Sequence, residues 1–186
     1  WLAAGTAATM LVSASSAREP RQVDVLITGG QVYSGALEPA RSVDVGLSGD
    51  RIVFIGDARA AGISAARSID AAGKMVVPGF IDAHVHATDE IASSDPKARL
   101  LLRQLTQGVT TNVIGVDGGG DPDVAAFAKT ATAAGTGGNF ASYVGFGAIR
   151  QRVLGDDARA PDAGELEQMK ALAAKGMCEG AYGLST

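Results

Sequence analysis

The sequence predicts an α/β protein in which a small β-domain precedes a parallel sheet with helices between its strands. Two observations carry this prediction. Short runs of alternating apolar and polar residues fill the chain before Pro78, and strand-like runs alternate with helix-like runs after it. We therefore expect a β-domain over 18–77 and a region of βα units over 78–186. Repeated βα units of this length imply a parallel sheet, either doubly wound or closed as a (β/α)8 TIM barrel.

The β-domain is predicted from runs of apolar and polar residues that turn signals separate. Thr28-Gly29-Gly30 ends the first run, and Ser48-Gly49-Asp50 joins two later runs in a hairpin pattern typical of a half-exposed sheet. The predicted strands are 23–27, 31–33, 43–47, 51–56 and 74–77.

After Pro78 the helices are predicted from their ends. An aspartate followed by proline begins two of them, because aspartate caps free N–H groups and proline is tolerated at the first helical position. Glycine ends each of them. The predicted helices run from Asp95-Pro96 to Gly108, from Asp121-Pro122 to Gly135 and from Pro161 to Gly176, between strands at 80–84, 109–114, 140–144 and 181–184.

Composition excludes some classes of function. The chain has 186 residues, a net charge of −4 and no run of Lys or Arg, which argues against nucleic-acid binding. A single cysteine, Cys178, excludes an internal disulfide framework. Cys178 is expected to be packed or inert, the alternative being a reactive thiol.

Residues 1–17 differ from the rest of the chain. An uncharged, largely apolar run over 2–12 is followed by small residues up to Ala17 and then by Arg18. This is typical of a secretory signal peptide cleaved near Ala17, of which the sequence would hold a remnant, and the run is too short for a stable membrane span. We therefore expect a secreted or periplasmic protein. The alternative is a loose Ala/Ser-rich tail.

The most informative motif is Pro78-Gly79-Phe80-Ile81-Asp82-Ala83-His84-Val85-His86. It holds both histidines of the chain, two residues apart at the end of an apolar run. On a strand, side chains two apart point the same way, so both imidazoles would converge on one point, which suits a metal ion. The alternative is a structural pair of histidines.

Further polar residues follow the predicted strands. Asp117 comes after the strand over 109–114 and Ser185 after the strand over 181–184, while Gly145 stands after the strand over 140–144. In a barrel the chemistry lies at the carboxyl ends of the strands. Polar residues at several such ends favour an active site there.

Four segments together resemble the N-acyl-D-amino-acid deacylases (D-aminoacylases) of the amidohydrolase superfamily, from about Val23 to the last residue. Their order and spacing are more specific than any one of them. They are Pro78-Gly79-Phe80-Ile81-Asp82-Ala83-His84-Val85-His86, Gln107-Gly108-Val109-Thr110-Thr111 with Gly115-Val116-Asp117-Gly118, Asn139-Phe140-Ala141-Ser142-Tyr143-Val144-Gly145-Phe146-Gly147-Ala148-Ile149-Arg150, and Glu179-Gly180-Ala181-Tyr182-Gly183-Leu184-Ser185-Thr186.

The resemblance implies a β-sandwich followed by a metal-dependent TIM barrel. It implies one or two zinc ions, with His84 and His86 as ligands. The family often has a cysteine ligand where this chain has Asp117, which is a harder ligand and holds zinc less tightly than a thiolate. We expect Asp117 to be a ligand, the alternative being a turn residue among glycines.

Two further positions bear on the substrate. The family tends to have Gly-His-Gly where this chain has Gly145-Phe146-Gly147, so any polar role of that histidine is absent here. Arg150 stands at a family-like position and is a candidate for binding an anionic group of the substrate. The alternative for Arg150 is a salt bridge between elements.

The resemblance also implies that this chain holds only part of the catalytic site. Residues 78–186 amount to less than half of the roughly 250 residues of a TIM barrel. Two further histidine ligands and a catalytic aspartate are implied on later strands, so no catalytic residue is expected in this chain. We expect the chain to be the N-terminal part of a longer protein and to be inactive alone.

Three functions remain open. The first is metal-dependent hydrolysis of linear amides, namely N-acyl-D-amino acids, in which the metal activates water and the later aspartate acts as general base. The second is hydrolysis of cyclic amides, as in dihydroorotases and hydantoinases, for which Lys129 and Lys175 are poorly placed as a carboxylated bridging lysine. The third is a truncated remnant without catalysis, or a module that needs a partner chain.

Overall fold

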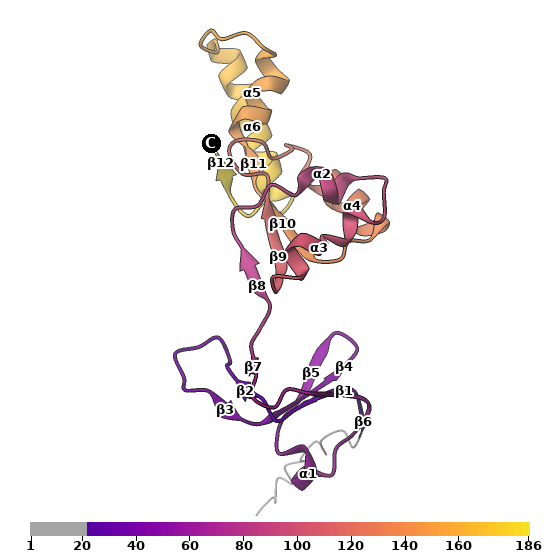
Figure 1. Cartoon of the computed structure of the whole chain (residues 1–186). Coiled ribbons are helices and arrows are strands. Elements are labelled where there is room, and N and C mark those ends of the chain that lie inside the picture. Colours follow the sequence, from indigo (N-terminus) through magenta and orange to yellow (C-terminus); the bar gives the residue numbers. More distant parts are fainter. Residues whose placement is uncertain (1–21) are drawn as a thin grey trace, which may run out of the picture. The chain divides into compact units, whose positions relative to one another are not determined.

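The computed structural model describes residues 22–186, which form two compact units with the boundary between Pro78 and Gly79 (Figure 1). The apolar run over 2–12 and the expected cleavage near Ala17 lie outside the described residues, so export stays a prediction from the sequence. Within residues 22–186, no helix combines the length and the apolar character needed to cross a membrane.

The first unit is built on two sheets. The larger has the strand order β5-β4-β1-β6, and the smaller has the order β3-β2-β7. Val23 and Leu26 of β1 pack with Phe54 of β5 and Ala58 of α1 in its core. The elements are β1 (Gln22–Thr28), β2 (Gln31–Val32), β3 (Arg41–Ser42), β4 (Asp44–Ser48), β5 (Arg51–Gly56), α1 (Ala58–Ala61), β6 (Ser64–Asp70) and β7 (Met75–Val76).

The predicted hairpin is confirmed, because β4 and β5 pair antiparallel around a turn in which Gly49 has a φ of 57°. The sequence analysis missed β6, which pairs parallel with β1 along its whole length. Its sequence, Ser-Ala-Ala-Arg-Ser-Ile-Asp, is mostly polar and exposed, so no apolar alternation marks it as a strand.

The second unit places parallel strands side by side. One sheet has the order β10-β9-β8, and β11 pairs with β12; every pairing in these two sheets is parallel. The carboxyl ends of β8, β9 and β10 therefore lie at one edge of their sheet. The strands are β8 (Phe80–Asp82), β9 (Val109–Ile114), β10 (Asn139–Ser142), β11 (Val144–Gly145) and β12 (Leu184–Ser185).

Helices fill the connections between these strands, so this unit is mixed α/β. The predicted helix from Asp95 to Gly108 is wrong: the chain forms two short turns there instead of one helix. Leu101 breaks it, because its backbone is left-handed with a φ of 50° while its side chain is 2% exposed. The helices are α2 (Thr88–Ala92), the 3-10 turn η1 (Ala98–Leu100), α3 (Leu102–Leu105), α4 (Val124–Ala134), α5 (Phe146–Leu154) and α6 (Ala163–Cys178).

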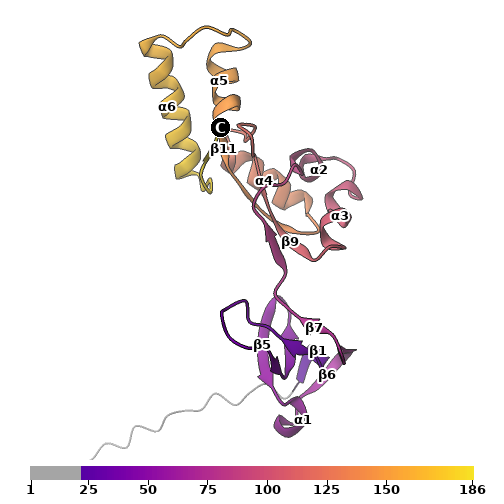
Figure 2. The same ribbon diagram turned by 60° about the vertical axis from the view of Figure 1, so that its left-hand side comes forward.

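Helices α5 and α6 lie side by side (Figure 2). Ile149 of α5 packs with Met169 of α6 and Val144 of β11 in a buried cluster, which fixes both helices to the strand. Helix α5 was not predicted, and no helix was assigned between the strand at 140–144 and the helix that begins at Pro161. Gly145 precedes α5 as its N-cap and has no side chain to cap the helix, so the usual start signal is absent.

Helix α6 begins in a capping box. The Glu165 N–H donates to Asp162 Oδ1, and the Asp162 N–H donates to Glu165 Oε2, both at 2.8 Å. The Glu165 carboxylate also accepts hydrogen bonds from the Arg159 guanidinium at 2.6 and 2.5 Å. Arg159 first, and then the Asp162 N–H, lowers the pKa of Glu165 from 4.5 to about 2.

This pKa predicts an acid-sensitive start of α6. A carboxyl with a lowered pKa in the folded state stabilises the fold above its unfolded pKa of 4.5, and this contribution is lost as the pH falls toward 2. Glu165→Gln should therefore flatten the dependence of Tm on pH between 5 and 2. Arg159→Gln should flatten it likewise, because it removes the partner. An unchanged slope in both variants, measured by thermal unfolding across this range, would contradict the assignment.

Candidate metal centre

His84 and His86 follow β8 at the carboxyl edge of the sheet. The strand ends at Asp82, two residues before His84, yet the chain continues beside β9 because the Val85 N–H donates to Val113 O at 3.2 Å. The Val85 side chain packs toward the apolar cluster around Ile91 and Ile114. With Val85 turned inward, both neighbouring histidines point to the other side.

A hydrogen bond also fixes the main chain just before the two histidines. The His84 N–H donates to the carboxylate Oδ1 of Asp82 at 3.0 Å. This bond closes a local turn in which an aspartate side chain accepts from the backbone two residues on. It fixes the direction in which the chain leaves β8 and enters the His84-Val85-His86 segment.

Asp117 lies in the turn that follows β9. Its φ is 52°, in the left-handed region, and Gly115 and Gly118 on either side have φ values of 75° and 74°. Aspartate tolerates this conformation better than most residues, and glycine adopts it freely. The backbone at Gly115 and Gly118 is buried, whereas the Asp117 side chain is exposed. The turn therefore presents the carboxylate outward from a packed backbone.

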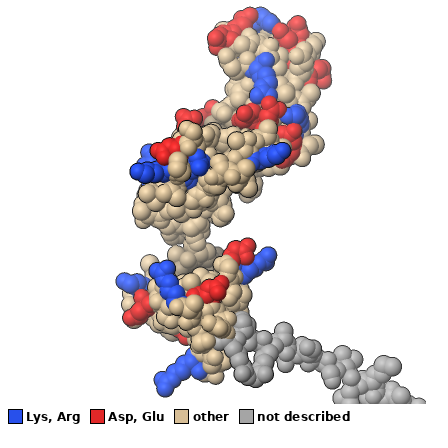
Figure 3. Space-filling view, turned by 90° about the vertical axis from the view of Figure 1, so that its right-hand side faces the viewer, with Lys and Arg blue, Asp and Glu red and all other residues tan. Residues whose placement is uncertain are grey.

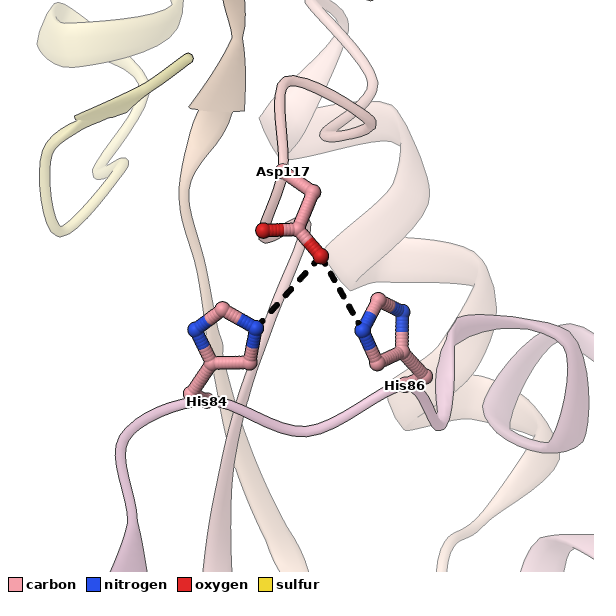
Figure 4. Close-up of side chains that lie close together, drawn as sticks. All are labelled: His84, His86 and Asp117. Carbon is pink, nitrogen blue, oxygen red and sulfur yellow. Dashed lines mark ion pairs between the residues drawn. The ribbon is translucent and has the colours of Figure 1, made fainter.

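The three side chains converge (Figure 4). Asp117 Oδ2 lies 3.4 Å from His84 Nε2 and 3.1 Å from His86 Nε2. The ring centroids of the two histidines are 5.6 Å apart. One ligand atom from each of the three residues lies within 4.8 Å of the others. The structure thus brings together all three residues that the sequence analysis proposed as ligands.

These donors fit a zinc ion. Imidazole nitrogens and carboxylate oxygens bind Zn²⁺ at about 2.0–2.2 Å. Atoms at that distance from a common tetrahedral ion lie roughly 3.4 Å apart, close to the two Nε2–Oδ2 distances. The side chains of His84, His86 and Asp117 are 60–70% exposed, so further ligands can approach the group.

Arg150 does not join this group. It lies in α5, and its guanidinium donates to the carbonyl oxygens of Asp157 and Arg159, at 2.5 and 2.8 Å. These bonds hold the connection between α5 and α6. A role of Arg150 in substrate binding stays a prediction. Phe146 is the first residue of α5 and 44% exposed, and Cys178 is an exposed free thiol at the end of α6.

A network of ion pairs anchors the chain as it leaves the Asp117 turn. The Arg152 guanidinium binds Asp121 at 3.2 Å and Asp123 at 2.5 Å, and the Lys175 ammonium also binds Asp123. Lys175 first, and then Arg152, lowers the pKa of Asp123. The network ties the segment before α4 to both α5 and α6. Basic and acidic side chains are interspersed on the face drawn in Figure 3.

Known proteins are similar to this chain in sequence and in overall fold. No family model matches the chain. A D-aminoacylase from Alcaligenes xylosoxydans xylosoxydans is 33% identical over 92% of this chain and 39% of its own length. The chain therefore spans about two-fifths of this curated relative.

Two solved structures are similar in both sequence and fold. The crystal structure of a D-aminoacylase, described as defining a novel subset of amidohydrolases, is 34% identical with a TM-score of 0.77, and the match covers 88% of this chain and 38% of that one. An N-acyl-D-glutamate deacylase from Bordetella bronchiseptica, solved with zinc and a phosphonate inhibitor that mimics the tetrahedral intermediate, is 31% identical with a TM-score of 0.78, over 89% of this chain and 38% of that one. Over most of its length, the chain is thus similar in sequence and in fold to D-aminoacylases and to an N-acyl-D-glutamate deacylase.

Proposed function

We propose that the protein containing this chain is a zinc-dependent hydrolase of N-acyl-D-amino acids, with His84, His86 and Asp117 among its metal ligands. The convergence of these three side chains at the carboxyl edge of a parallel sheet carries the proposal. The relatives add support, since one is a deacylase solved with zinc.

We further propose the architecture in which this site works. The unit over 79–186 would form the first part of a (β/α)8 TIM barrel, and the unit before it would form part of a β-sandwich. Parallel strands joined through helices, with candidate ligands at their carboxyl ends, support the barrel. The presence of two sheets in the first unit is compatible with a sandwich.

Each of the three residues has a defined task in this proposal. His84 and His86 offer the lone pair of Nε2, so both must be neutral at that atom to bind. Asp117 offers a carboxylate oxygen and one negative charge. When bound, zinc would polarise the amide carbonyl and lower the pKa of a water molecule toward 7. The aspartate that the resemblance implies as general base would come from a later strand than those described here.

Asp117 changes the character of the site relative to the family pattern. A carboxylate is a harder ligand than the thiolate that the resemblance leads one to expect. The site would hold zinc less tightly than a site with cysteine at this position, and it would discriminate less against oxygen-preferring metals.

The test uses the product of the complete coding sequence. We expect it to hydrolyse N-acetyl-D-amino acids faster than their L enantiomers, to lose this activity on chelation and to regain it with Zn²⁺. Hydrolysis that survives exhaustive chelation would exclude the metal mechanism. Turnover of hydantoin in place of the N-acetyl-D-amino acids would favour the cyclic-amide alternative.

A further inference from the structure

We infer that Ser185 is a positioning residue that holds Asp117 in place for metal binding. The inference rests on the proposed metal site and adds a residue that does not itself touch the metal. Ser185 lies on β12, close to the last described residue and nearly 70 positions from the turn in sequence.

The turn that carries Asp117 needs external support. A non-glycine residue with a φ near 52° is in a sparsely populated conformation, which persists only when its surroundings enforce it. The Asp117 side chain is exposed and its own contacts are with two histidines from another segment, so it contributes little to fixing its own backbone.

Ser185 bridges the two ends of this turn. Its hydroxyl donates to the carbonyl oxygen of Gly115 at 2.6 Å and accepts from the Gly118 N–H at 3.2 Å. A hydroxyl is suited to this task because it donates and accepts at once. The two bonds span the residues on either side of Asp117 and fix the separation of Gly115 and Gly118.

Ser185 is itself held by the sheet. It pairs with Gly145 of β11, and the Gly145 N–H donates to Gly120 O at 2.8 Å. On the far side of the turn, the Ala148 N–H of α5 donates to Gly118 O at 2.9 Å. Because the pairing of β11 and β12 fixes Ser185, its hydroxyl also fixes the position of the turn to which it is hydrogen-bonded.

Removal of the hydroxyl would leave the turn's backbone without these bonds. Gly118 is buried, so water would not readily replace the lost acceptor. Asp117 would then sample several orientations, of which few face His84 and His86. Loss of an outer group that orients a metal ligand typically lowers metal affinity by about 10–100-fold.

The experiment compares Ser185→Thr with Ser185→Val, which have nearly the same shape and differ in the hydroxyl. We expect the Val variant to bind Zn²⁺ about 10–100-fold more weakly than the wild type and to show an altered visible spectrum with Co²⁺. The Thr variant should recover both properties. Thr130→Val serves as a control, because it removes a hydroxyl that bonds only within α4, to Ala126 O.

A second readout needs no metal. Hydrogen exchange at the Gly118 amide of the metal-free protein should be at least about 10-fold faster in Ser185→Val than in Ser185→Thr. Equal exchange in the two variants would overturn the inference, and so would faster exchange with unchanged zinc affinity. If the wild type binds no zinc at all, the proposed function fails, while the exchange rates still decide whether Ser185 holds the turn.

Discussion

Replacing His86 by alanine is expected to lower the affinity of the protein for Zn²⁺ by more than about 100-fold. Loss of a group that merely orients a ligand costs about 10–100-fold, and this substitution removes a proposed ligand. The His86 Nε2 lies 3.1 Å from Asp117 Oδ2, closer than the Nε2 of His84. After the substitution, one imidazole and one carboxylate would remain in the group.

Isothermal titration of the chelator-treated protein with Zn²⁺ measures this affinity. The His86 side chain is 70% exposed, so the substitution should change the free energy of unfolding of the metal-free protein by less than about 0.5 kcal/mol. Asp156→Asn, on the connection between α5 and α6, is the control, because it changes an exposed carboxylate that lies outside the candidate metal centre. Zinc binding by His86→Ala at the wild-type level would mean that the imidazole is not a ligand.

Gly120→Ala is expected to destabilise the fold by about 3 kcal/mol, at the upper end of what overpacking costs. A Cβ at this position would lie 2.0 Å from the carbonyl oxygen of Tyr143 and 3.0 Å from the backbone nitrogen of Gly145. Backbone atoms cannot rotate away as a side chain can. The turn and the strand pair would have to separate, which would also displace Asp117.

Thermal unfolding measures the effect. For a chain of this size, each kcal/mol corresponds to a change in Tm of roughly 2–4 °C, so a fall of about 10 °C is expected. Gly164→Ala is the matched control, since a Cβ there meets a side-chain oxygen of Asp162 at 3.4 Å and lies within α6. A Gly120→Ala protein as stable as the Gly164→Ala control would contradict the close approach.

The candidate metal centre could largely be predicted from the sequence. The spacing of His84 and His86 after an apolar run, and Asp117 after the next strand, are local signals, and the rule that parallel strands end at one edge brings them together. The contact of Ser185 with the turn carries no such signal, because it joins residues nearly 70 positions apart through backbone atoms.

The fold was less completely predictable. Apolar alternation revealed the β4–β5 hairpin, whereas the polar strand β6 owes its place to pairing with β1 rather than to its own pattern. The capping aspartate at position 95 suggested one long helix, but burial of Leu101 in a left-handed conformation divides it. Tertiary packing overrides local propensity at both positions.

The turn that carries Asp117 is fixed by close backbone packing and by the Ser185 hydroxyl, and neither depends on the side chain at position 117. In evolutionary terms, the side chain at position 117 can change without a change of this frame, within the residue types that tolerate a left-handed backbone. With the proposed ligand at position 117, an exchange of thiolate for carboxylate would shift the preferred metal, while Gly120 admits almost no replacement. The metal preference of such a site would therefore change through one position, whereas its backbone frame would not change as readily.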